Sequence, residues 1–244
     1  FIHEANARPG RSNQLLAKRA SKVFAGAAGL EKYFPADRTA FTGNPVRQSI
    51  VNSSATREEG LQFFGLNPGL KTVLVTGGSL GAKGINEAIA AQLSQLGENK
   101  VQLIWQTGKN FEATAKQYCA GKTGMWAGDF ISRMELAYAA ADVVVSRAGA
   151  MAIAELSVAG KPVIFVPYPY AAEDHQTLNA QYLVQQQAAQ CIRDAEAKEK
   201  LVPALLALVH NEKACEQLGK QIRKLAITDA DDRIAKKIYS TLGC

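Results

Sequence analysis

The feature of this sequence that most constrains its fold is a regular alternation of short apolar runs and longer amphipathic segments, which starts near Lys71. The apolar runs are continuous rather than interrupted by polar residues, and this is typical of strands buried on both faces of a parallel sheet. The amphipathic segments between them have the spacing of helices that cover such a sheet. The sequence therefore predicts a doubly wound α/β domain with a parallel sheet.

Individual elements can be placed from these patterns. We expect strands over residues 71–76, 101–106, 142–146, 163–166 and 189–193. We expect helices over residues 82–96, 111–119, 131–140, 150–159 and 174–187, with three more helical segments closing the chain. This arrangement is Rossmann-like, and ligands of such domains bind beyond the carboxyl ends of the strands. The loops that could form a site are therefore those after Thr76, Gln106, Ser146 and Val166.

The first part of the chain follows a different pattern. Residues 1–45 hold the end of a buried strand, a turn, a helix, a short strand and a final Gly-Asn-Pro break. We interpret them as the tail of a preceding Rossmann-like domain plus a linker. Because the chain starts with Phe1 at a strand end, we expect it to be part of a larger protein. We assign residues 46–226 to the main domain and residues 227–244 to a C-terminal helix that packs back on the N-terminal domain.

Composition and charge narrow the class of protein. Hydrophobic residues make up 47% and charged residues 20% of the chain, which is the balance of a globular protein with a sizeable core. No apolar run approaches the roughly 20 residues that a membrane helix needs. The net charge of +6 is compatible with an anionic lipid surface, a phosphorylated substrate or solubility alone. Nucleic acid is disfavoured as a partner, because no recognition motif accompanies the basic residues.

Cysteine and histidine usage argues against a metal site. The four cysteines, Cys119, Cys191, Cys215 and Cys244, are scattered, with no C-x-x-C pair and no histidine nearby. This spacing disfavours zinc and a disulfide framework, and it is typical of a protein from a reducing cytoplasm. No cluster of His, Asp and Glu suggests another metal ion. We therefore expect no metal and no other bound cofactor.

The first candidate site is the turn Gly77-Gly78-Ser79-Leu80-Gly81-Ala82, between a predicted strand and a predicted helix. Glycines let backbone N–H groups approach an anion closely, and a helix N-terminus adds positive potential. Ser79 could add a hydroxyl donor. The spacing is neither that of a dinucleotide fingerprint nor that of a P-loop. A tight turn without a ligand is an equally good interpretation of this motif alone.

The second candidate site spans residues 146–155, where a strand again ends in a small-residue turn at a helix start. The N–H groups around Ala150, Met151 and Ala152 would be free for a diphosphate. Glu155 lies one turn inside the helix, where a carboxylate can accept hydrogen bonds from a ribose diol. The alternative is that Glu155 only complements the helix dipole.

The third candidate site is a polar cluster over residues 173–180, also at a helix start. Polar side chains at such a position, including His175 and Gln176, can bind the hydroxyl groups of a sugar. An ordinary N-cap followed by a solvated face is the alternative. Because His175 is flanked by other hydrogen-bonding residues, we interpret it as a ligand contact or a surface residue rather than an acid–base catalyst.

These motifs, taken in order along the chain, resemble those of a known family. The segments that carry the resemblance are His3-Glu4-Ala5-Asn6 with Pro9-Gly10 and Asn13 to Ala17, Gly43-Asn44-Pro45-Val46-Arg47, Gly77 to Ala82 with Asn86, Arg147 to Glu155, and His175-Gln176 with Asn179-Ala180. Together they resemble the bacterial peptidoglycan N-acetylglucosaminyltransferases of glycosyltransferase family 28. The resemblance covers nearly the whole chain. It implies a GT-B fold, in which two Rossmann-like domains face each other across a cleft.

The resemblance also implies an activity and a set of site residues. The donor would be UDP-N-acetylglucosamine (UDP-GlcNAc), and the full-length enzyme would transfer its sugar, with inversion, to the 4-hydroxyl of the muramic acid of lipid I, giving lipid II. The donor residues would be Arg47 at the hinge, Ser79 with Ala150, Met151 and Ala152 at the diphosphate, Glu155 at the ribose, Phe130, Ile131 and Met134 around the uracil, and His175 and Gln176 at the sugar. The acceptor side of the cleft would be lined by His3, Glu4, Asn6 and Asn13.

The chain also departs from the family pattern. Leu80 stands where Gln is usual, Ala152 where Thr is usual, and His175 where Gln is usual. The catalytic base is expected in the family's N-terminal domain, whose glycine-rich G-G-T-G-G-H loop does not occur in this sequence. We therefore expect this segment to be the donor-binding half and to be inactive alone. The alternatives are another GT-B enzyme of UDP-sugars, such as a UDP-GlcNAc 2-epimerase, or a non-catalytic nucleotide-sugar-binding module.

The implied acceptor suggests a location. Lipid I is undecaprenyl-pyrophosphoryl-MurNAc-pentapeptide, and its polyprenyl chain anchors it in a membrane. The resemblance therefore implies peripheral attachment to an anionic membrane surface, on the cytoplasmic side of the bacterial inner membrane. The basic excess could contribute to this attachment, because Lys and Arg near an anionic surface are attracted to it.

Overall fold

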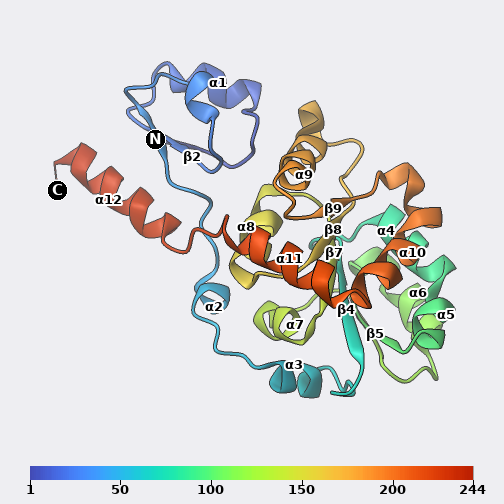
Figure 1. Cartoon of the computed structure of the whole chain (residues 1–244). Helices are drawn as coiled ribbons and strands as arrows, with labels where there is room; N and C mark the ends of the chain where they lie inside the picture. Colours follow the sequence, from blue (N-terminus) through green and yellow to red (C-terminus); the bar gives the residue numbers. More distant parts are fainter. Residues whose placement is uncertain (244) are drawn as a thin grey trace.

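Six parallel strands form the larger of two sheets in the computed structural model, which describes residues 1–243 (Figure 1). The strands are β4 (Lys71–Thr76), β5 (Val101–Gln106), β6 (Met125–Gly128), β7 (Val143–Ser146), β8 (Val163–Phe165) and β9 (Gln190–Cys191). Their order across the sheet is β6-β5-β4-β7-β8-β9. The chain winds outward from β4 in one direction and from β7 in the other, which is the Rossmann order. The predicted fold class is confirmed.

The strand order reverses between β4 and β7, and the register aligns the polar residues that end these strands. Thr76 of β4 pairs with Gln106 of β5 on one side and with Ser146 of β7 on the other. At such a reversal the connections leave in opposite directions, which opens a crevice beyond the carboxyl ends of the strands. Three of the loops predicted to form a site therefore start side by side.

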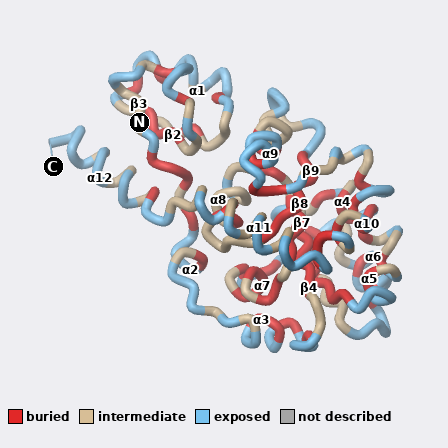
Figure 2. The backbone as a smooth tube through the Cα atoms, viewed as in Figure 1, coloured by how far each residue is buried: buried red, intermediate tan, exposed pale blue. Residues whose placement is uncertain are grey.

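Helices cover both faces of the large sheet, and the strands between them are buried (Figure 2). One face carries α2 (Gln48–Val51), α3 (Arg57–Phe63), α7 (Met134–Ala140), α8 (Ala150–Ala159) and α9 (His175–Gln185). The other carries α4 (Lys83–Ala91), α5 (Leu93–Glu98), α6 (Lys109–Cys119) and α10 (Ala197–Val209). Successive residues of β4 serve the two cores in turn, since Leu74 belongs to the first and Val73 and Val75 to the second. α11 (Glu212–Arg223) packs against α8 and α10.

Helix ends follow from the local sequence. α3 begins with a capping box, in which the Thr56 hydroxyl accepts from the Glu59 N–H at 3.2 Å and the Glu59 carboxylate accepts from the Thr56 N–H at 2.8 Å. α8 ends at Gly160, which has a left-handed backbone (φ 63°). Glycine adopts this conformation without a steric penalty, so it is a favourable C-cap.

Several elements differ from the sequence-based predictions, and three of them have a clear local reason. The helix expected over 82–96 is two helices, because the backbone of Gln92 (φ −128°) leaves the helical region between them. The helix expected from residue 131 begins at Met134, since the Ile131 N–H donates to the Gln106 side chain instead (3.2 Å). The strand β6 is not predicted by the sequence, because its four residues are too few to show a period.

A second, smaller sheet near the N-terminus has a core of its own. Its parallel strands lie in the order β1 (Ile2–Glu4), β2 (Val23–Ala25) and β3 (Thr39–Phe41), with α1 (Arg11–Ala17) and the 3-10 helix η1 (Leu30–Lys32) in the connections. The core comprises Ala17, Ala20, Val23, Ala25, Leu30 and Phe34. Parallel strands joined by helical connections are the arrangement of a Rossmann-like unit, and the assignment of this segment to the tail of a preceding domain stays a prediction.

The last helix, α12 (Ala230–Leu242), extends away from the larger unit, next to the linker between the two sheets (Figure 1). The segment just before α12 contacts the linker, because Ile227 packs against Gly43. Of the residues of α12, which the structure describes from Ala230 to Leu242, Ala230 is buried and the others are partly or fully exposed. The three domain boundaries and the packing of α12 on an N-terminal domain stay predictions. Cys244 lies outside the described residues.

Two further findings concern the described residues as a group. Among residues 1–243, no helix combines the length and the apolar character needed to cross a membrane. Cys119, Cys191 and Cys215 are free thiols. Burial raises the pKa of each thiol above its ordinary value, which keeps these cysteines protonated at neutral pH.

Candidate functional site

A cavity of about 1240 Å³ opens at the carboxyl edge of the large sheet, where the strand order reverses. Residues that follow β4, β5, β7 and β8 line it, so all four predicted loops contribute. Most of the predicted donor residues are among them, namely Arg47, Ser79, Phe130, Met134, Met151, Ala152, Glu155 and Gln176. The structure thus brings together residues that are more than 100 positions apart in the chain. Ile131, Ala150 and His175 do not line this cavity.

The glycine-rich turn after β4 is held tightly against the loop after β5. Gly78 and Gly81 both have a left-handed backbone (φ 81° and 76°), which favours glycine. A Cβ atom at residue 81 would lie 2.0 Å from the carbonyl oxygen of Thr107, so a larger residue does not fit there. Ser79 lies exposed between the two glycines, at the cavity wall. The turn therefore presents backbone and a hydroxyl group to the cavity, as the anion-binding prediction requires.

The turn after β7 leads directly into α8. Gly149 is the N-cap residue, and no side chain caps the helix. The first bond of the helix runs from the Ile153 N–H to the Gly149 carbonyl (3.0 Å), so the N–H groups of residues 150–152 have no carbonyl partner within it. The second and third of these residues line the large cavity, whereas Ala150 lines a smaller cavity toward the N-terminal unit. The helix start directs positive potential at the large cavity.

Glu155 lies in the second turn of α8, and two side chains fix its carboxylate. Arg47, from the linker, donates through Nε to Oε1 at 3.0 Å and through Nη2 to Oε2 at 3.2 Å. Tyr138 of α7 donates its hydroxyl to Oε2 at 3.2 Å. Burial, and then the nearby Glu155 carboxylate, raise the pKa of Tyr138 well above its ordinary value, so the hydroxyl stays a donor at neutral pH. These three bonds hold the carboxylate in place and use three of its roughly four acceptor positions, so at least one is left for a further donor.

The residues predicted to frame a base lie between β6 and α7. Phe130 is 54% exposed and Met134 is nearly buried, and both line the cavity. Ile131 is buried, and its N–H donates to the Oε1 atom of Gln106 at 3.2 Å. The loop therefore offers an apolar wall, while the Ile131 N–H is already bonded within the protein. A role of Ile131 in base recognition stays a prediction.

Gln176 and His175 are neighbours at the start of α9 but have different surroundings. Gln176 lines the cavity, and its Oε1 atom accepts from the Tyr168 N–H at 2.9 Å. The Nδ1 atom of His175 instead contacts the carbonyl oxygen of Ala172 at 2.7 Å. The structure thus places Gln176 where it can contact a ligand, and it places His175 outside the cavity.

Sequence reasoning missed several residues of the cavity wall. Tyr138 lies within a helix whose other buried residues are apolar, so no local pattern marks it. Tyr168 lies in a loop, and Asp194 begins the 3-10 helix η3 (Asp194–Glu196), which follows the last strand. Gln106 did carry a signal, because a polar residue that ends an apolar strand points to the carboxyl edge of the sheet.

The four residues predicted on the acceptor side belong to the N-terminal unit and do not line the large cavity. Glu4 is 3% exposed. Its Oε1 atom accepts from the Asn6 N–H (3.0 Å), and its Oε2 atom accepts from the Gly10 N–H (3.0 Å) and the Asn13 amide (2.9 Å). His3 contacts a carbonyl oxygen of the linker at 3.2 Å. Glu4 therefore organises the turn after β1, and the acceptor-side role of this group stays a prediction.

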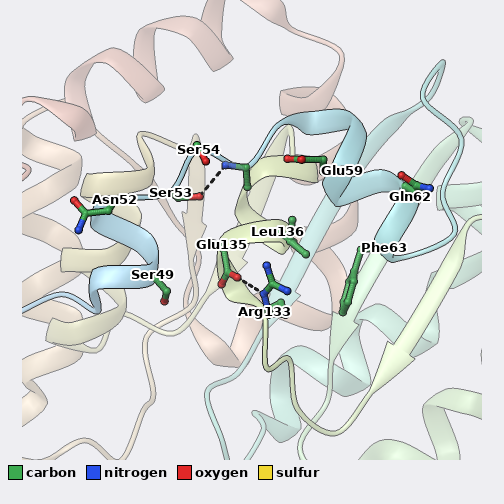
Figure 3. Close-up of a pocket in the computed structure, with 11 residues that line it drawn as sticks. Ser49, Asn52, Ser53, Ser54, Glu59, Gln62, Phe63, Arg133, Glu135 and Leu136 are labelled. Carbon is green, nitrogen blue, oxygen red and sulfur yellow. Dashed lines mark hydrogen bonds and ion pairs between the residues drawn. The ribbon is translucent and has the colours of Figure 1, made fainter.

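A second cavity, of about 580 Å³, lies between α2, α3 and the start of α7 (Figure 3). Polar side chains such as Ser49 and Asn52 line it, together with the ion pair between Arg133 and Glu135. The predicted site residues do not contribute to it. Across residues 1–243, no group of three or more His, Cys, Asp or Glu side chains is placed to hold a metal ion.

The Rossmann order of the large sheet, the cavity at its reversal point and the second, smaller parallel sheet are features of a GT-B protein. The profile of the Glycosyltransferase family 28 C-terminal domain matches residues 72–234. The chain belongs to this family.

Two similar proteins, which share one name, support this assignment. The UDP-N-acetylglucosamine--N-acetylmuramyl-(pentapeptide) pyrophosphoryl-undecaprenol N-acetylglucosamine transferase of Parabacteroides distasonis is 48% identical, over 99% of this chain and 66% of that protein. The protein of that name from Cytophaga hutchinsonii is 44% identical, over 100% of this chain and 65% of that protein. The chain therefore spans slightly less than two thirds of the length of these relatives.

Solved structures agree with the fold. The crystal structure of Acinetobacter baumannii MurG matches with a TM-score of 0.75 at 27% identity, over 98% of this chain and 66% of that chain. A UDP-N-acetylglucosamine 2-epimerase matches with a TM-score of 0.65 at 13% identity, over 97% of this chain and 62% of that chain. The second likeness concerns the fold alone.

Proposed function

We propose that this chain is the donor-binding half of an inverting N-acetylglucosaminyltransferase, which transfers GlcNAc from UDP-GlcNAc to the muramic acid 4-hydroxyl of lipid I and so forms lipid II for peptidoglycan. The observation that carries the proposal is that Glu155 borders the same cavity as Met151 and Ala152, whose N–H groups are free at the start of α8. A ribose diol and a diphosphate, which are the two polar parts of UDP, fit these two kinds of partner. The relatives named above support GlcNAc as the sugar.

In this proposal the protein stabilises the leaving group with backbone dipoles. The diphosphate lies at the N-terminus of α8, with Ser79 contributing a hydroxyl donor. When the bond between the sugar and UDP breaks, negative charge grows on the diphosphate oxygen. The N–H groups of residues 150–152 are already oriented for that charge, so little reorganisation is needed. The acceptor hydroxyl attacks the opposite side of the anomeric carbon, which inverts its configuration. We expect the general base to come from the family's N-terminal domain.

The location follows from the acceptor. Because lipid I is anchored by a polyprenyl chain, the reaction takes place at a membrane surface, and we infer peripheral attachment at the cytoplasmic face of the inner membrane. The net charge of +6 supports attraction to anionic lipids.

Calorimetry of this chain with UDP-GlcNAc, with and without EDTA, tests the donor site. We expect binding at one site that chelation does not change, because helix N–H groups rather than a cation hold the diphosphate. Loss of binding on chelation would contradict this. A product assay with the full-length protein and lipid I then separates transfer, which yields a disaccharide on the lipid, from epimerisation, which yields a different UDP-sugar.

A second candidate function is nucleotide-sugar binding without catalysis. It is favoured by one observation, namely that all residues lining the large cavity fall between positions 47 and 194, so the N-terminal unit contributes none of them. If this chain binds UDP as tightly as the full-length protein but only the latter turns over, binding belongs to this chain and catalysis to the whole enzyme. Turnover by this chain alone would contradict that division.

A further inference from the structure

An ion pair in the wall of the large cavity has no role in the function proposed so far. It joins Arg147, directly after β7, to Asp194, in the 3-10 helix after β9. The two side chains are only 11% and 20% exposed. Because β8 lies between β7 and β9 in the sheet, the pair bridges the carboxyl end of β8. It therefore lies beneath the loop that connects β8 to α9.

The same arginine holds the start of that loop. Its Nη1 atom donates to the carbonyl oxygens of Val166 and Pro167, both at 3.0 Å. Its guanidinium carbon lies 5.5 Å from the centre of the Tyr168 ring, which is cation–π distance. One side chain thus fixes three consecutive residues. A lysine could not replace it fully, since an ammonium group lacks the planar guanidinium that lies over the Tyr168 ring.

The fixed loop in turn orients Gln176. The Tyr168 N–H, which can only donate, bonds to the Oε1 atom of Gln176 at 2.9 Å. This contact determines which way the amide is turned. With its oxygen engaged by the loop, the side chain has its NH₂ group left for the cavity that it lines. Gln176 can therefore present hydrogen-bond donors, and these suit the hydroxyl and carbonyl oxygens of a sugar.

Asp194 is anchored from a second side, independently of any ligand. A Cβ atom at Gly84, in the first turn of α4, would lie 2.5 Å from its Oδ1 atom, so the carboxylate rests directly on the start of that helix. A helix N-terminus favours a negative charge at this position. The start of α4 therefore limits how the carboxylate can move, and a Cβ atom at residue 84 would displace it from its present position.

We propose that Asp194 is a positioning residue which, through Arg147 and the loop at residues 166–168, holds Gln176 ready to recognise the sugar of the donor. The inference rests on the proposed donor function. It predicts a selective effect, because these successive contacts end at the residue proposed to bind the sugar and not at those proposed to bind the nucleotide. Disturbing Asp194 has to weaken binding of UDP-GlcNAc while leaving that of UDP in place.

The test compares the affinities of UDP and UDP-GlcNAc by calorimetry for the wild-type chain and for Asp194→Asn, which keeps the shape but removes the charge. We expect the affinity ratio in favour of UDP-GlcNAc to fall about five- to tenfold, as for loss of one hydrogen bond. UDP affinity should stay the same or increase, because Arg147 loses its counter-charge next to the diphosphate site. Retained UDP binding also shows that the variant is folded.

Two further variants make the result decisive. In an Arg147→Met background, which lacks both the charge and the donors of the arginine, Asp194→Asn should have no additional effect on the ratio, because the path through the arginine is already broken. Asp142→Asn is the matched control, since Asp142 forms a similarly buried ion pair with Arg57 (3.0 Å) at the other end of β7. It should leave the ratio unchanged.

The outcomes separate this inference from the proposed function. If the wild-type chain binds neither ligand, the proposed donor site is wrong. If it binds UDP but Asp194→Asn leaves the ratio unchanged, or if Asp142→Asn lowers it equally, the donor site stands and the positioning role of Asp194 is overturned.

Discussion

The substitution Glu155→Gln gives the most informative perturbation of the donor site. The carboxylate is 15% exposed and accepts hydrogen bonds from Arg47 and Tyr138. Glutamine keeps the shape and one acceptor oxygen but replaces the second oxygen with a donor. If Glu155 accepts from both hydroxyls of the ribose diol, one of these bonds is lost and the other no longer has a charged acceptor.

The size of the effect follows from these contacts. Losing hydrogen bonds to a charged group costs about 1–3 kcal/mol, which corresponds to UDP binding weakened roughly 5- to 150-fold. Weakening the ion pair with Arg47 does not reverse the expected loss of UDP affinity. The arginine side chain is 49% exposed, and such pairs contribute at most about 1 kcal/mol. We therefore expect weaker UDP binding with nearly unchanged stability.

Calorimetry with UDP and a melting curve measure the two quantities. Glu155→Ala is less suitable alone, since it leaves the buried Tyr138 hydroxyl without its acceptor and should lower the free energy of unfolding by about 1–3 kcal/mol. In Glu155→Gln an acceptor oxygen remains for Tyr138. Unchanged UDP affinity in the glutamine variant, with an unchanged melting temperature, would refute the ribose role and leave Glu155 as a helix-dipole residue.

Three other predictions follow from single features. Gly81→Ala should lower the free energy of unfolding by about 2 kcal/mol or more, because it combines a left-handed backbone with a 2.0 Å contact to Thr107, whereas Gly65→Ala, left-handed but in open space, should cost only about 1–2 kcal/mol in a urea titration. The raised pKa of Tyr138 means that its contribution to stability is complete below pH ~10 and is lost as the pH rises further, so the stability difference between wild type and Tyr138→Phe should shrink between pH 9 and 11, and a constant difference would contradict the buried, bonded hydroxyl. Sedimentation with anionic vesicles should show weak binding of this chain that salt abolishes, and tighter, less salt-sensitive binding of the full-length protein; equal, salt-independent binding by both would place an apolar membrane contact in this chain.

The sequence was sufficient where local patterns determine structure. The residues of β4 and β5 match the predicted strands because each is a mainly apolar run that ends in a polar residue. The bounds of α8 also match, since small residues start the helix and Gly160 ends it. Because the carboxyl ends of parallel strands share one edge, the position of the cavity followed from the strands alone.

The remaining features depend on contacts between distant residues. Tyr138 reaches Glu155 only because α7 and α8 pack on the same face of the sheet. The amide of Gln176 is oriented by a backbone N–H in the loop that precedes α9, and no pattern around residue 176 indicates it. His175 shows the opposite case. It occupies a motif position, but its ring contacts the backbone three residues earlier instead of lining the cavity. Such details follow from tertiary packing rather than from the period or the spacing of the sequence.

A crystal structure of this chain with UDP-GlcNAc would show directly where the donor binds. We expect the nucleotide in the large cavity, with both ribose hydroxyls within hydrogen-bond distance of Glu155 and the diphosphate against the N–H groups of residues 150–152. A nucleotide bound in the cavity between α2, α3 and α7, or bound in the large cavity with its ribose turned away from Glu155, would contradict it.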